Sequence, residues 1–107
     1  MKEKCMSNWT KIVALTDIPR LGSRVVRSAK GDIAVFRTED DRVFALHNQC
    51  PHKGGPLSQG IVYGDKVACP LHGWKISLAN GAAEEPDVGH TACYAVKVEE
   101  GTVYLEL

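Results

Sequence analysis

Long hydrophobic runs are absent from this chain of 107 residues. A membrane-spanning helix requires about 20 consecutive apolar residues, and no apolar segment here approaches that length. Residues 1–6 are charged but no apolar stretch follows them, so they do not resemble a secretory signal peptide. We therefore expect a cytoplasmic protein with no membrane partner.

An excess of charge of either sign is also missing. The chain has 13 lysine and arginine residues against 13 aspartate and glutamate residues. Proteins that neutralise the phosphates of nucleic acids need a strongly basic surface. The sequence therefore predicts that nucleic acid is not a partner.

Cysteine is scarce, with four in the chain. Cys5 lies in residues 1–8, which we expect to be frayed, and Cys93 lies far along the chain in a strand-like segment. Small domains held together by disulfides are denser in cysteine. A disulfide framework is not expected, and this leaves Cys50 and Cys69 for another role.

A helical repeat of 3.6 residues is not sustained anywhere in the sequence. Short runs of β-branched and apolar residues alternate with turn residues instead, which predicts an all-β fold built from hairpins. Asn80-Gly81 is the best candidate for a type I′ turn. The expected strands are residues 9–15, 24–29, 33–38, 43–48, 61–63, 66–69, 75–78, 92–99 and 102–107.

The length of the chain suits one domain. Apolar residues alternate along its last two expected strands, so each strand has one inward face. The core residues expected there are Tyr94, Val96, Val98, Val103, Leu105 and Leu107.

Cysteine and histidine occur together in two short segments, residues 50–52 (CPH) and 69–72 (CPLH). In a Rieske [2Fe–2S] cluster, two cysteines hold one iron and two histidines hold the other. Glycines after each segment permit the backbone turns of a cluster-binding loop. The predicted ligands are Cys50 and Cys69 on one iron and His52 and His72 on the other.

A structural zinc site in an interaction module is the alternative, because thiolates and imidazoles also bind zinc. Zinc sites usually pair cysteine with cysteine and histidine with histidine at close spacing, whereas each segment here mixes the two. The spacing favours the iron–sulfur cluster. His47 and His90 are interpreted as hydrogen-bonded or solvated residues and not as ligands, and Trp74 is expected to pack beside the second segment.

Five segments of the chain, two of which contain the predicted ligands, form a further pattern: residues 9–12 (WTKI), 18–26 (IPRLGSRVV), 50–60 (CPHKGGPLSQG), 69–74 (CPLHGW) and 96–98 (VKV). In these segments the sequence resembles the Rieske proteins, and among them the small subunit of NAD(P)H-dependent assimilatory nitrite reductase. The resemblance implies a Rieske-type antiparallel β-sandwich or barrel forming one domain over residues 9–107. A small cluster-binding subdomain of about residues 47–76 would be inserted into a scaffold of residues 9–46 and 77–107.

The partner implied by this resemblance is a large subunit that carries flavin, a [4Fe–4S] cluster and sirohaem and reduces nitrite to ammonium in nitrate assimilation. The chain would be the non-catalytic subunit of that oxidoreductase. A free Rieske ferredoxin that serves an aromatic-ring dioxygenase is the alternative among electron carriers.

Rieske proteins of respiratory complexes are similar at the ligands but have an additional disulfide between the two loops and hydroxyl groups near the sulfurs. The matching positions here hold Gly55 and Leu71 for the cysteines, Trp74 for a serine and Ile76 for a tyrosine. Hydrogen bonds to the sulfurs raise the reduction potential of such a cluster. The resemblance therefore implies a low potential.

Overall fold

The computed structural model describes residues 9–28, 31–49, 56–70, 73–84 and 89–106. Within these ranges the chain forms strands and two short 3₁₀ turns but no α-helix, which confirms the all-β class. No helix in the described part of the chain could cross a membrane. The strands are β1 (Trp9–Ala14), β2 (Gly22–Ser28), β3 (Gly31–Arg37), β4 (Val43–His47), β5 (Ile61–Tyr63), β6 (Lys66–Ala68), β7 (Lys75–Ser77), β8 (Cys93–Tyr94), β9 (Val96–Glu99) and β10 (Thr102–Glu106), and the 3₁₀ turns are η2 (Leu15–Asp17) and η3 (Leu57–Gln59).

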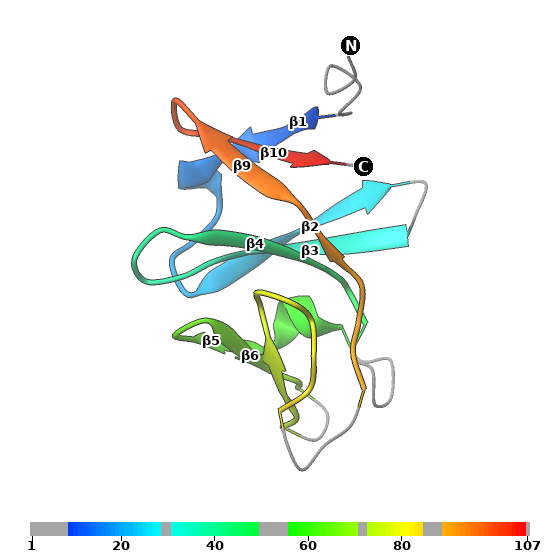
Figure 1. Cartoon of the computed structure of the whole chain (residues 1–107). Helices are drawn as coiled ribbons and strands as arrows, with labels where there is room; N and C mark the ends of the chain where they lie inside the picture. Colours follow the sequence, from blue (N-terminus) through cyan, green and yellow to red (C-terminus); the bar gives the residue numbers. More distant parts are fainter. Residues whose placement is uncertain (1–8, 29–30, 50–55, 71–72, 85–88, 107) are drawn as a thin grey trace.

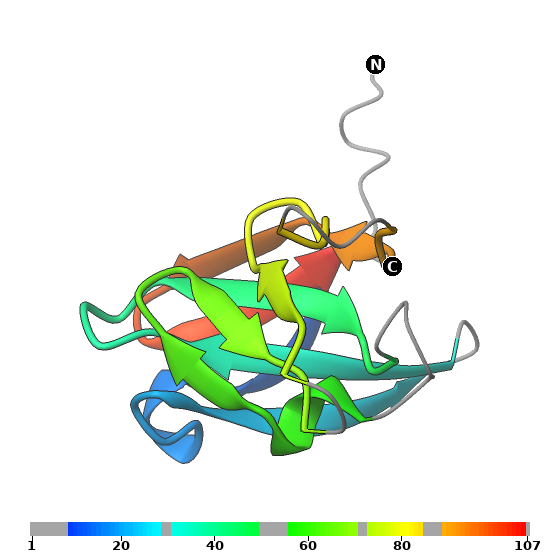
Figure 2. The same ribbon diagram turned by 90° about the horizontal axis from the view of Figure 1, so that it is seen from below.

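The described residues form three antiparallel sheets (Figure 1). The upper sheet has the strand order β1-β10-β9, the middle sheet β2-β3-β4-β8 and the lower sheet β5-β6-β7. Figure 2, seen from below, shows the lower sheet lying against the middle one. The second predicted ligand segment connects two strands of the lower sheet, β6 and β7.

Strand β3 is covered on both faces. Its residues Ile33, Ala34, Val35 and Phe36 are all fully buried. Because successive side chains of a strand point to opposite faces, Ile33 and Val35 face the upper sheet and Ala34 and Phe36 face the lower one. Burial on both faces explains why this strand is a continuous apolar run and not an alternating one.

Buried residues in the described part of the chain form two hydrophobic cores, one on each side of the middle sheet. We call them the upper core and the lower core. The upper core consists of Ile18, Ile33, Val35, Ala45, Val103 and Leu105. The lower core consists of Ala34, Phe36, Leu46, Leu57, Val62, Val67, Cys69, Ile76 and Leu78.

The strand expected over residues 92–99 is divided in the structure. Its first part, β8, pairs with β4 of the middle sheet, and its second part, β9, pairs with β10 of the upper sheet. Ala95 lies between the two parts, where the chain passes from one sheet to the other. Local sequence contains no sign of this change of partner.

The core prediction for the last two strands is correct for two residues and wrong for one. Val103 and Leu105 are fully buried, and Tyr94 and Val96 pack at the border of the upper core. Val98 is 40% exposed, because β9 is an edge strand and Val98 lies one residue before its end. Leu107 lies outside the described residues.

A type I′ turn connects β9 to β10. Its central residues Glu100 and Gly101 have φ angles of 50° and 76°, and they lie between the paired residues Glu99 and Thr102. Positive φ at both central residues defines this turn, whose twist matches that of the strands.

The prediction of a type I′ turn at Asn80-Gly81 is wrong. Of these two residues only Gly81 has a positive φ, 75°. The Gly81 N–H donates to the Ser77 carbonyl at 2.7 Å, and Asn80 Oδ1 accepts a hydrogen bond from the Ala82 N–H at 2.9 Å. The connection is therefore longer than two residues and is stabilised by the asparagine side chain.

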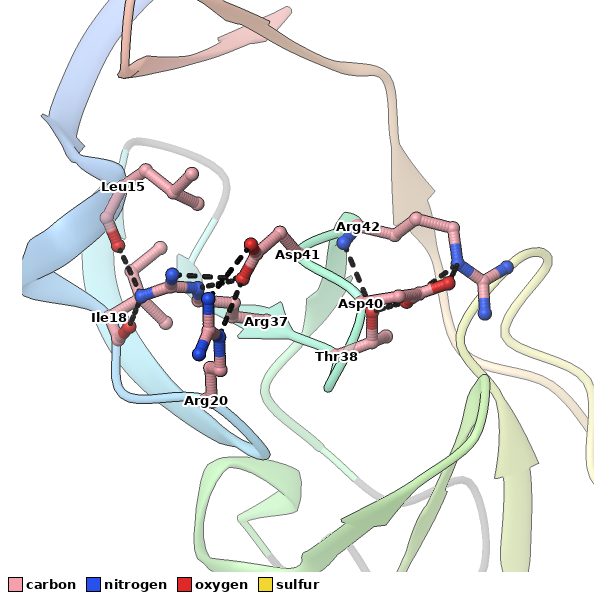
Figure 3. A network of polar contacts seen from close by, with 8 residues as sticks. All are labelled: Leu15, Ile18, Arg20, Arg37, Thr38, Asp40, Asp41 and Arg42. Carbon is pink, nitrogen blue, oxygen red and sulfur yellow. Dashed lines mark hydrogen bonds and ion pairs between the residues drawn. The ribbon is translucent and has the colours of Figure 1, made fainter.

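An ionic network fastens the β3–β4 hairpin to the segment after β1 (Figure 3). Asp41 accepts hydrogen bonds from Arg20 Nε and Arg37 Nε, both at 2.9 Å. Arg37 Nη1 also donates to the carbonyls of Leu15 and Ile18, at 3.2 and 2.8 Å. The hydrogen bonds from Arg20 and then Arg37 lower the pKa of Asp41 to about 2.

Candidate metal centre

Cys69 is the predicted ligand that lies within the described residues. It directly follows β6, belongs to the lower core and is 3% exposed. Its sulfur forms no disulfide. Its N–H donates to the Trp74 carbonyl at 2.7 Å, and its carbonyl accepts from the Gly73 N–H at 2.9 Å. The sulfur is thus free and buried, and the N–H and carbonyl of the same residue are both hydrogen-bonded. These properties suit a soft thiolate ligand of iron.

The connection from β6 to β7 is closed by these two backbone hydrogen bonds. Gly73 has a φ of +73°, a left-handed conformation that glycine adopts at little cost. Trp74 is half-buried and packs against the lower core, which confirms the packing role predicted for it. The second ligand segment is therefore held at its base by the lower sheet.

The other three predicted ligands, Cys50, His52 and His72, lie outside the described residues, as do Gly55 and Leu71. In the ranges that the structure describes, no group of three histidine, cysteine, aspartate or glutamate side chains could hold a metal ion. The described part of the chain therefore offers no competing metal site.

Hydrogen bonds join the parts of the chain that lie before and after the first ligand segment. Asn48 follows β4, and its Oδ1 accepts a hydrogen bond from the Ser58 N–H at 2.8 Å. The Ser58 carbonyl accepts a hydrogen bond from Ser23 Oγ at 2.8 Å. The Asn48 N–H donates to the Asp32 carbonyl at 2.9 Å. Sequence reasoning missed these residues, because contacts over ten and 35 positions leave no local pattern.

His47 and His90 have no place in the predicted ligand set. The His47 ring nitrogen Nε2 lies 3.2 Å from Gln49 Oε1, and the backbone N–H of His47 donates to the Ala92 carbonyl at 2.8 Å. A Cβ added to Gly31 would lie 2.9 Å from His47 Cε1, so the ring packs closely on that glycine. His47 is thus the hydrogen-bonded structural histidine that was expected, and His90 is exposed.

Two thiolates and two imidazoles are the donor set of a Rieske cluster, and the buried free thiol of Cys69 fits the part that a cysteine would have in it. Ferredoxin CarAc of Metapseudomonas resinovorans is 33% identical over 99 residues, which cover 91% of this chain and 92% of that ferredoxin.

Solved structures include relatives of two kinds. A protein assigned as the NADH-dependent nitrite reductase small subunit of Mycobacterium tuberculosis has a TM-score of 0.84 at 26% identity, covering 95% of this chain and 96% of the other. A chain from a complex of reduced oxygenase and oxidised ferredoxin in carbazole 1,9a-dioxygenase has a TM-score of 0.80 at 30% identity, covering 92% of both chains.

The family described as "Rieske-like [2Fe-2S] domain" matches residues 8–106, nearly the whole chain. This match extends over all three sheets and both ligand segments. The chain therefore belongs to the Rieske-like [2Fe–2S] domain family, as an electron-transfer domain whose cofactor is a Rieske-type [2Fe–2S] cluster.

Proposed function

We propose that this chain is the electron-transfer small subunit of an NAD(P)H-dependent nitrite reductase. The observation that carries the proposal is the likeness to the M. tuberculosis small subunit, which spans 95% of this chain and 96% of the other. In this proposal the chain supplies electron transfer and not the nitrite-reducing site.

The ligands that we propose for the cluster are Cys50 and Cys69 on one iron and His52 and His72 on the other. When bound, the cluster accepts and releases one electron at a time. The burial of Cys69 in the lower core supports its place in this set, since an apolar surrounding keeps water away from a metal-bound sulfur. The hydrogen bonds of its backbone to Gly73 and Trp74 fix the direction of its side chain.

The partner in this proposal is a large subunit with flavin, a [4Fe–4S] cluster and sirohaem. Electrons from reduced nicotinamide would reach nitrite within that complex. Such a role places the chain in the cytoplasm, where reduced nicotinamide is formed and consumed.

A free ferredoxin of an aromatic-ring dioxygenase system is the second candidate. The observation that favours it is the 33% identity to ferredoxin CarAc over 92% of that protein. In this alternative the chain would carry electrons to an oxygenase, and it would leave its partner after each transfer.

Reconstitution with the large subunit tests the first proposal. We expect His72→Ala to lose the Rieske cluster and to reduce the nitrite reduction rate of the complex, while His90→Ala, a change of an exposed histidine outside the ligand set, leaves both unchanged. Equal rates for the wild type and His72→Ala in an intact complex would contradict an electron-transfer role in nitrite reduction.

Purification of the chain from its source with its bound partners separates the two candidates. A co-purifying protein that contains sirohaem supports the nitrite reductase subunit. An oxygenase supports the ferredoxin. Iron and acid-labile sulfide in equal amounts, with no zinc, are expected in either case.

A further inference from the structure

Ser58 is hydrogen-bonded through both of its backbone groups by side chains from other parts of the chain. Its N–H donates to Asn48 Oδ1, and its carbonyl accepts from Ser23 Oγ, each at 2.8 Å. Both bonds are partly buried, so water competes with them less than at an open surface. We call Ser23, Asn48 and Ser58 the Ser58 clamp.

The clamp joins η3 to the middle sheet. Ser23 lies on β2, and Asn48 directly follows β4. The Asn48 N–H also donates to the carbonyl of Asp32 on β3. Ser58 is therefore anchored to three strands of one sheet, and the ten-position span from Asn48 to Ser58 is closed at its ends.

The same short turn is packed against the strand that leads to Cys69. Leu57 of η3 is fully buried in the lower core together with Cys69. A Cβ added to Gly60 would lie only 2.2 Å from the carbonyl oxygen of Ala68. No Cβ could fit there without a backbone shift, so Gly60, which directly follows η3, packs closely on Ala68 of β6. A shift of Ser58 would therefore be passed on to the strand before Cys69.

We propose that the Ser58 clamp fixes Asn48 and Ser58, the two ends of the first cluster-binding span, relative to Cys69. This inference rests on the proposed ligand set, because the span that Asn48 and Ser58 close contains Cys50 and His52. Ser23 and Asn48 are positioning residues that act through Ser58. Loosening the clamp would let the first segment move relative to Cys69, and the geometry of the ligands affects the retention, the potential and the spectrum of a metal centre.

Ser23→Ala in the full chain with its cluster tests the proposal, and Ser28→Ala is its matched control. Ser28 lies on the same strand, and its Oγ donates to the Gly31 carbonyl, also at 2.8 Å. We expect Ser23→Ala to lose its cluster to a chelator about two- to tenfold faster than the wild type, the factor that one hydrogen bond provides. Its midpoint potential and its electron paramagnetic resonance g-values should shift, whereas Ser28→Ala keeps the wild-type values.

Three further variants make the outcome decisive. Asn48→Ala should shift the same three properties, and Ser23→Thr, which keeps a hydroxyl donor, should restore them. If Ser23→Ala and Asn48→Ala match Ser28→Ala in cluster loss, potential and g-values, the clamp has no positioning role. Cys50→Ser tests the ligand set separately from the clamp. A normal cluster in Cys50→Ser would overturn both the ligand set and the clamp. Loss of the cluster in Cys50→Ser, together with wild-type cluster properties in Ser23→Ala and Asn48→Ala, would overturn the clamp alone.

Discussion

At the scale of single residues, Asp41 combines an unusual backbone with a central ionic role. Its φ of 66° lies in the left-handed region, where aspartate and asparagine are tolerated better than most residues. From this position its carboxylate meets the guanidinium groups of both Arg20 and Arg37. Arg37 is 12% exposed in its side chain, so it depends on Asp41 more than the exposed Arg20 does.

Asp41→Asn should reduce the free energy of unfolding at neutral pH and have a smaller effect in acid. The pKa of Asp41 is lowered in the fold from 3.8 to about 2. A carboxylate with a lowered pKa stabilises the fold above its unfolded pKa, and this contribution disappears as the pH falls through its folded pKa. The difference between wild type and variant should therefore shrink from pH 4 to about pH 2.

Urea denaturation of the wild type and Asp41→Asn, from neutral pH down to about pH 2, measures the difference in their free energies of unfolding. Asparagine keeps the left-handed backbone and nearly the same shape, so the variant isolates the charge. A difference that stays constant down to the lowest pH would contradict the ionic explanation.

Two residues after the second ligand segment bear on the reduction potential. Ile76 is fully buried in the lower core beside Cys69, and Trp74 packs against the same core. Neither has a hydroxyl group that could donate to a cluster sulfur. We expect a midpoint potential in the lower part of the roughly −150 to +300 mV Rieske range. Protein-film voltammetry measures it, and a value near the top of that range would contradict this expectation.

At the scale of elements, the β9–β10 hairpin contains an avoidable strain. Glu100 has a φ of 50°, although a residue with a Cβ pays for the left-handed conformation unless its side chain is short and polar. Asparagine before glycine is the preferred pair for this turn. Glu100→Asn should therefore raise the free energy of unfolding by about 0.5–1 kcal/mol.

Gly101→Ala is the opposite test on the same turn. Gly101 has a φ of 76°, and nothing lies within 4 Å of an added Cβ. Any loss of stability therefore comes from the backbone and not from a clash, and we expect about 1 kcal/mol. Thermal unfolding of Glu100→Asn and Gly101→Ala measures the two changes in stability. If both variants were more stable than the wild type, or both less stable, the left-handed backbone would not explain the residues preferred in this turn.

At the scale of the whole molecule, the middle sheet separates the upper core from the lower core. Among the described residues, the lower core contains the predicted ligand Cys69, and the upper core contains no predicted ligand. Ile76→Ala in the lower core and Leu105→Ala in the upper core each remove a fully buried aliphatic side chain. Both should lower the free energy of unfolding by about 2–5 kcal/mol.

Only Ile76→Ala should also change the cluster, because Ile76 shares its core with Cys69. Urea denaturation gives the stability of each variant, and electron paramagnetic resonance of the reduced proteins gives the state of the cluster. Equal changes in the spectra of Ile76→Ala and Leu105→Ala would mean that a cavity in the upper core affects the cluster as much as one in the lower core.

Much of the fold could be predicted because its signals are local. β-branched runs marked the places of the strands, and alternation marked Val103 and Leu105 as buried. The exposed position of Val98 and the division of residues 92–99 could not be predicted, because both depend on which sheet lies above or beside the strand. Asn80-Gly81 is the dipeptide preferred in a type I′ turn, but its conformation follows from the longer connection in which the Gly81 N–H bonds to the Ser77 carbonyl.

The chemistry predicted for the site follows from local sequence, because ligand type and spacing are properties of two short segments and need no distant contacts. The surroundings of Cys69 follow from folding: Cys69 is buried in the lower core, and Ser23 and Asn48 are hydrogen-bonded to Ser58 across 35 and ten positions. Contacts over such separations follow from the packing of whole sheets. For this reason candidate donors can be recognised in the linear sequence, whereas the side chains packed and bonded around them appear only in the folded chain.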